Sequence, residues 1–162
     1  MNSGAVTSEY RFEKRRTQAL VRLSSGELSQ GCFFTASSAR HDGPERVWDL
    51  LNAETGFFPF EIQDKTGTRT VLYNRTHVVS VALSDNEASR EPGYSVATRR
   101  FVTMQLSTGD RVAGAVRVYR PEGRDRLSDW ARQSEAFRYL ETDNLTLIVN
   151  SAHIIEVSEA SE

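Results

Sequence analysis

The chain has 162 residues and a mass of 18.2 kDa, a length typical of one domain or of two very small ones. An apolar share of 38% excludes a disordered or collagen-like chain, and a single cysteine excludes an internal disulfide or a multi-cysteine metal site. The net charge of −2 argues against bulk-charge binding to nucleic acid, and the absence of a long apolar run predicts a cytoplasmic protein without membrane contact.

The first part of the chain predicts two strands, a short helix and three further strands. Residues 18–23 alternate between apolar and polar, the pattern of a half-buried strand, and residues 28–35 follow after a Ser-Ser-Gly-Glu turn. Val47, Leu50 and Leu51 form one apolar stripe, which indicates a helix. The last three strands are expected near 57–63, 69–74 and 77–83.

The second part of the chain predicts the same order of elements. Strands are expected at 102–106 and 112–119, on either side of a Ser-Thr-Gly-Asp turn, and Leu127 with Trp130 marks a short helix. Glycine inside the second strand of each part, at Gly31 and Gly114, indicates a bulge or a sharp bend. The final strands are expected at 137–142, 145–150 and 153–158.

Matching segments recur in the same order, which we interpret as a tandem duplication. The segment Leu-Ser-Ser-Gly-Glu at 23–27 reappears as Leu-Ser-Thr-Gly-Asp at 106–110, and Asn-Arg-Thr-His at 74–77 reappears as Asn-Ser-Ala-His at 150–153. The predicted fold is mainly β: two tandem five-stranded barrels, each with one short helix, packed as a pseudo-twofold pair. The expected divisions are a flexible N-terminal segment, a first barrel, a linker, a second barrel and a tail, at 1–15, 16–83, 84–98, 99–158 and 159–162.

Two family resemblances accompany this interpretation. The segment Tyr-Asn-Arg-Thr-His-Val-Val-Ser-Val at 73–81 resembles the Tyr-Lys-His-Ala-Ile-Ser-x-Val segment of the bacterial Sm-like RNA chaperone, whose Lys-His pair lies beside bound RNA. The chain is also similar to an uncharacterised bacterial family of small β-barrels of Sm-like or SH3-like character, which implies an architecture and no established activity. The residues that carry this second resemblance are Arg46, Asp49, Leu50, Leu51, Asn52, Phe57, Asn74, His77 and Val81.

The paired Asn-x-x-His segments are the candidate site for a ligand or RNA. Their histidines occupy the same place in both parts, and imidazole binds ligands and titrates near neutral pH. The alternative is that Asn and His hydrogen-bond the backbone of a tight turn at the entry to a strand. The candidate residues are Asn74, Arg75, His77, Asn150 and His153.

A second candidate surface is a pair of aromatic residues in the first part. Phe34 and Phe58 correspond to Arg117 and Arg138 in the second part, so both phenylalanines are expected to face outward. An outward aromatic pair is typical of an interface, here either between the two copies or with a partner.

The chain carries none of the common catalytic or cofactor signatures, such as a nucleophile elbow, a phosphate-binding loop or a dinucleotide fingerprint. Asp49 and Asp129 each follow an arginine by three residues, which predicts a surface ion pair rather than acid–base catalysis. We therefore predict a non-catalytic binding or adaptor module without metal or cofactor. Its ligand is expected to be another protein, a second copy of the chain or a small anion. The alternative is an Sm-like RNA-binding protein, which the net charge disfavours.

Overall fold

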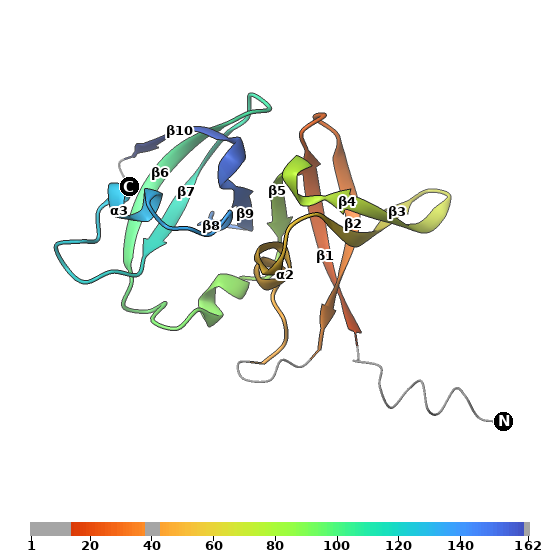
Figure 1. Cartoon of the computed structure of the whole chain (residues 1–162), viewed down its shortest axis with the longest axis horizontal. Coiled ribbons are helices and arrows are strands. Elements are labelled where there is room, and N and C mark those ends of the chain that lie inside the picture. The colour runs from red at the N-terminus through yellow and green to blue at the C-terminus, as the bar shows by residue number, and fades with distance from the viewer. Residues whose placement is uncertain (1–13, 38–42, 161–162) are drawn as a thin grey trace.

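The computed structural model describes residues 14–37 and 43–160. In this part the chain is mainly β, with one antiparallel sheet of ten strands in the order β10-β6-β7-β8-β9-β5-β1-β2-β3-β4. Figure 1 shows two halves side by side, which we call the first half (residues 14–83) and the second half (residues 98–160). None of the helices in the described part is long and apolar enough to cross a bilayer.

Each half has five strands, one α-helix and one 3-10 helix in the same order. The elements of the first half are β1 (Lys14–Leu23), β2 (Leu28–Ala36), α2 (Val47–Ala53), β3 (Phe57–Asp64), β4 (Gly67–Asn74), η1 (Arg75–His77) and β5 (Val78–Leu83). Those of the second half are β6 (Thr98–Leu106), β7 (Arg111–Val118), α3 (Leu127–Ala131), β8 (Phe137–Glu141), β9 (Thr146–Asn150), η3 (Ser151–His153) and β10 (Ile154–Glu159).

The first strand is longer than the sequence predicts. Its polar start shows no alternation, yet Lys14 pairs with Ala36 and Arg15 with Thr35, so both basic residues belong to β1 rather than to the N-terminal segment. The remainder of the predicted N-terminal segment, residues 1–13, lies outside the described residues, as do residues 161–162 of the predicted tail.

Glycine allows the second strand of each half to pass very close to the third. A Cβ atom on Gly31 would lie 1.9 Å from the carbonyl oxygen of Glu61, and one on Gly114 would lie 2.5 Å from that of Glu141. Any side chain would therefore displace the neighbouring backbone, because real Cβ atoms do not approach so closely. The two glycines from which the sequence predicts a bend are therefore required by this close contact.

The two halves are joined by pairing between β5 and β9, in which Val81 lies opposite Ile148. This differs from the expected pseudo-twofold packing, because a twofold axis would match this pairing with one between the counterpart strands β10 and β4, which lie at opposite ends of the sheet. The apolar cores also cross the junction: Phe137 and Ile148 of the second half belong to the core of the first, and Val79 of the first half belongs to the core of the second. The sheet is continuous and does not close.

The predicted linker is folded against both halves and contains the 3-10 helix η2 (Glu87–Arg90). Glu87 and Ala88 are 4% and 2% exposed, although the surrounding sequence is polar. We call residues 84–97 the strap, because they connect the halves and contact both.

Candidate functional site

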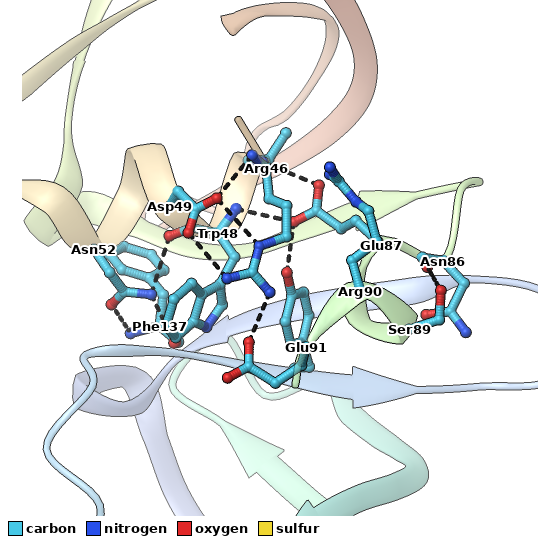
Figure 2. Close-up of polar contacts among 12 residues, drawn as sticks. Arg46, Trp48, Asp49, Asn52, Asn86, Glu87, Ser89, Arg90, Glu91 and Phe137 are labelled. Carbon is cyan, nitrogen blue, oxygen red and sulfur yellow. Dashed lines mark hydrogen bonds and ion pairs between the residues drawn. The ribbon is translucent and has the colours of Figure 1, made fainter. Parts of the chain in front are cut away.

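The strap holds the N-terminus of α2 through a buried carboxylate (Figure 2). Glu87 accepts hydrogen bonds from the backbone N–H groups of Val47 at 2.9 Å and Trp48 at 3.0 Å. Its Oε2 also accepts from the Tyr139 hydroxyl at 2.7 Å. The first N–H groups of a helix lack intrahelical partners and favour negative charge, so Glu87 satisfies both needs. Burial and the Glu87 carboxylate raise the pKa of Tyr139 above its ordinary value.

Arg46 lies at the same place and bonds to carboxylates from two elements (Figure 2). Its guanidinium donates to Asp49 at 3.0 and 3.1 Å and to Glu91 of the strap at 2.7 Å. Burial alone would lower the pKa of Arg46, but the hydrogen bonds to Asp49 and Glu91 raise it above the ordinary value. The predicted pair of Arg46 with Asp49 is confirmed, whereas the side chain of Asp129 pairs with Arg132 at 3.6 Å.

Asn52 connects α2 to the second half by two hydrogen bonds to one residue. Its amide nitrogen donates to the carbonyl oxygen of Phe137 at 3.1 Å, and its amide oxygen accepts from the Phe137 N–H at 3.0 Å. The side chain thus meets the backbone of β8 as a neighbouring strand would. Together with Glu87 and Glu91, it fixes the position of α2 relative to β8 and the strap (Figure 2).

This network borders a small aromatic recess of about 70 Å³. Five of its lining side chains are aromatic, and they come from both halves: Trp48, Tyr119, Trp130, Phe137 and Tyr139. Trp48 stacks on Tyr139 with ring centroids 5.9 Å apart. Burial and nearby carboxylates raise the pKa of Tyr119 to about 12.

A wider cleft of about 600 Å³ adjoins the recess. Glu135 and Phe137 line both cavities, so the recess and the cleft lie next to each other between the halves. The remaining wall of the cleft comes from the end of α2 and the loop after it, the loop before β8 and the two 3-10 turns. It includes Glu54, Arg75 and Asn150. We call the recess and the cleft together the inter-half groove.

The predicted Asn-x-x-His side chains bond within the protein. In the described structure Asn150 and His153 reach across the junction, whereas Asn74 and His77 bond within their own half. Asn74 accepts from the Thr76 N–H at 3.0 Å, and Asn150 accepts from the Ala152 N–H at 3.1 Å, so each caps a 3-10 turn. Asn150 also donates across the junction to the Val78 carbonyl at 2.9 Å. These contacts are those of the turn interpretation.

The two histidines make one contact in common and differ in another. His77 Nδ1 lies 2.8 Å from the Ser24 hydroxyl, and His153 Nδ1 lies 2.7 Å from that of Ser107. His153 Nε2 also lies 2.8 Å from the carbonyl oxygen of Thr76 in the other half. Because a carbonyl only accepts, Nε2 carries the proton, and in neutral His153 Nδ1 accepts from the serine.

Arg75, the fifth predicted site residue, is part of the cleft wall but is only 6% exposed. Its guanidinium donates to the carbonyl oxygens of Leu50 at 2.9 Å and Phe57 at 2.8 Å and lies over the Phe58 ring. Burial lowers the pKa of Arg75 from its ordinary value. Among the described residues its Nε is buried without a hydrogen-bond partner.

The expected outward pair of phenylalanines is wrong for Phe58. This side chain is 1% exposed and stacks on Phe33 with centroids 5.3 Å apart, while Phe34 is half-buried on β2. The corresponding Arg138 is also buried, at 8% exposed, because its guanidinium bonds to the carbonyl oxygens of Trp130 and Gln133. An arginine at the equivalent position was therefore a poor sign of exposure.

The groove itself was missed by sequence reasoning. Glu87 lies in a polar segment with nothing to distinguish it from its neighbours. Trp48, Trp130 and Tyr139 lie in separate helices and strands, and no local pattern brings them together. Among the described residues no group of three or more His, Cys, Asp and Glu side chains is placed to hold a metal ion. Comparison with known proteins finds no matching family model, curated protein or solved structure.

Proposed function

We propose that the protein is a non-catalytic adaptor that holds a segment of a partner protein in the inter-half groove. The observation that carries this proposal is a cleft of about 600 Å³ directly beside an aromatic recess. Ligand pockets commonly measure about 300–1,000 Å³, and protein interfaces depend on a few aromatic anchor sites surrounded by polar contacts. The recess fits one apolar anchor side chain, and the cleft fits the flanking chain.

The charges of the groove favour a basic segment. Glu54 is exposed at the rim and lies 3.8 Å from the Arg75 guanidinium, and in the described structure Glu135 makes no ion pair. Its arginines are already engaged: Arg117 pairs with Glu141 at 2.8 Å, and Arg75 and Arg138 bond to carbonyls. The unpaired carboxylate of Glu135, beside guanidinium groups that are already occupied, disfavours a small anion or an RNA phosphate as the ligand.

We further propose that each half is a small Sm-like or SH3-like barrel and that the pair arose by tandem duplication in a cytoplasmic protein. The same element order in both halves supports this proposal. So does the shared register, in which Phe57 lies opposite Asn74 and Phe137 lies opposite Asn150.

The test uses peptides selected by display against the full chain and titrated by tryptophan fluorescence. Trp48 and Trp130, the chain's two tryptophans, both line the recess, so a peptide seated there changes the emission directly. We expect selected peptides to combine an apolar anchor with basic residues. Glu135→Lys is expected to weaken their binding by about tenfold or more, since it reverses the charge facing them.

The matched control is Glu122→Lys, which makes the same change of charge at an exposed loop position outside the groove and is expected to leave binding unchanged. Labelled RNA is titrated in parallel at several salt concentrations. RNA binding that weakens steeply with salt and increases with Glu135→Lys would overturn the proposal in favour of the Sm-like alternative.

A further inference from the structure

The β5–β9 contact joins strands that do not correspond to each other. β5 is the fifth strand of the first half, whereas β9 is the fourth strand of the second. Their counterparts, β10 and β4, are the two ends of the sheet, and no described strand lies on their outer sides. A contact between two different surfaces leaves one free copy of each surface on every chain.

The side chains buried at the junction have exposed counterparts at the two ends. Val79 of β5 and Ile148 of β9 are each 0% exposed, and each belongs to the core of the opposite half. At the corresponding positions, Ile155 of β10 is 64% exposed and Leu72 of β4 is 66% exposed. Two large apolar side chains therefore face solvent at the places where their counterparts are fully covered.

The correspondence rests on strand pairing as well as on sequence. Val79 has no partner residue in the pairing of β5 with β1, which passes from Val78 to Ser80. Ile155 has none at the corresponding place in the pairing of β10 with β6. A bulge of this kind re-aims the side chain of the extra residue. Leu72 and Ile148 each lie opposite the third residue of the preceding strand.

The polar contacts at the junction also have an unused counterpart. Asn150 donates to the carbonyls of Val78 and Arg75, and His153 lies against that of Thr76. Within the described residues the Asn74 amide nitrogen and His77 Nε2 make no such bond. The first half thus carries the same Asn-x-x-His donors, but in the described structure no main-chain carbonyls of another half lie against them.

We propose that a second copy of this chain supplies these carbonyls, with β10 of one molecule pairing antiparallel to β4 of the next. In this head-to-tail contact Ile155 enters the first half of the neighbour, as Val79 enters the second half within one chain. Asn74 and His77 donate to main-chain carbonyls of the neighbour's η3 turn. Charge agrees with this pairing, because β10 carries Glu156 and Glu159 and β4 carries Arg69 without an acidic residue.

The test measures the mass of the full chain in solution by sedimentation velocity over a range of concentrations. We expect the wild type to form species heavier than the 18.2 kDa monomer. Leu72→Glu and Ile155→Glu each place a charge at one of the two surfaces, so each variant alone is expected to remain monomeric. An equimolar mixture is expected to form dimers, because each variant keeps the surface that the other has lost.

The control variant is Leu28→Glu, which changes a leucine that is 50% exposed on β2, a strand paired on both sides. It is expected to assemble as the wild type does, and circular dichroism checks that all variants fold. A monomeric wild type, assembly of either edge variant alone, or a mixture that stays monomeric would each overturn the proposal.

The register is tested by cross-linking. Leu83 lies opposite Thr146 at the junction, so Glu159 of one molecule is expected to lie opposite Thr70 of the next. A chain carrying Thr70→Cys, mixed with one carrying Glu159→Cys, is expected to form a disulfide-linked dimer on oxidation. Neither chain is expected to do so alone, and native Cys32 does not interfere because it is 2% exposed. Cross-linking of Thr70→Cys to itself would contradict the head-to-tail register.

Discussion

Single polar side chains in this protein join elements that lie far apart in the sequence. Glu87 lies in the strap, yet it bonds to the N-terminus of α2 and to Tyr139 of β8. Losing one partner of such a buried hydrogen bond commonly costs about 1–3 kcal/mol, because the other partner is left unsatisfied. Ionisation of the Tyr139 hydroxyl therefore affects the contact between the strap and both halves.

The tyrosine pKa values predict a loss of stability in alkaline solution. The pKa of Tyr139 is raised by burial and by Glu87, and that of Tyr119 is raised to about 12. A tyrosine whose pKa is raised in the folded state contributes stability that is fully present below the ordinary tyrosine pKa of about 10. This contribution is lost as the pH rises through the pKa of the folded state. We expect the free energy of unfolding to fall as the pH rises above about 10.

This prediction is measured by denaturant unfolding at several pH values, together with a tyrosinate absorbance titration of the native protein. Two groups are expected to titrate late, and Tyr139→Phe is expected to remove one of them. The urea-unfolded chain, in which all five tyrosines are exposed to solvent, is the control. Native and unfolded titration curves that coincide would contradict the prediction.

At the scale of elements, the sequence predicted five strands and one helix in each half, and the structure has these elements. Period-two alternation and Gly turns suffice for this, because a half-buried strand must place apolar residues on one face. Alternation missed the start of β1, whose polar residues are held by pairing with β2. At Gly31 the sequence predicted only a bend. It could not predict the close approach of β2 to β3, because the distance between these strands depends on where β3 lies.

Substitution of the two strand glycines is expected to destabilise the protein in proportion to the clash. A Cβ on Gly31 meets the Glu61 carbonyl oxygen at 1.9 Å, and one on Gly114 meets that of Glu141 at 2.5 Å. Overpacking commonly costs about 1–3 kcal/mol, so Gly114→Ala should lie in this range and Gly31→Ala at or above its upper end. Urea unfolding measures both.

The control for this comparison is Gly26→Ala, at a turn glycine with a φ of 91° and no heavy atom within 4 Å of the added Cβ. It is expected to cost only the backbone strain of about 1–2 kcal/mol. Equal losses for Gly26→Ala and Gly31→Ala would show that the close contact with β3 does not determine the cost.

At the scale of the whole molecule, the halves share their cores and should unfold together. Phe137 of the second half is 3% exposed within the core of the first, and Val79 is fully buried in the core of the second. We expect one calorimetric transition whose van't Hoff and calorimetric enthalpies agree. Phe137→Ala is expected to lower stability by about 3–5 kcal/mol and to shift this transition without splitting it.

The control is Leu28→Ala, at an exposed position outside both cores, where a change within about 0.5 kcal/mol is expected. Two separate transitions in the wild type, or a second transition produced by Phe137→Ala, would show that the halves are independent units.

The sequence by itself determined the mainly β class and the element order, because alternation and turn residues depend on neighbours along the chain. It left the Asn-x-x-His segments open between a ligand site and a turn. It did not determine that Phe58 and its counterpart Arg138 are both buried, since an arginine side chain can satisfy its donors on helix carbonyls. Only the tertiary structure decided that β5 lies against β9, because the partner of an edge strand depends on shape across the whole sheet. The inter-half groove and the exposed Leu72 and Ile155 follow from that junction, and from no local feature of the chain.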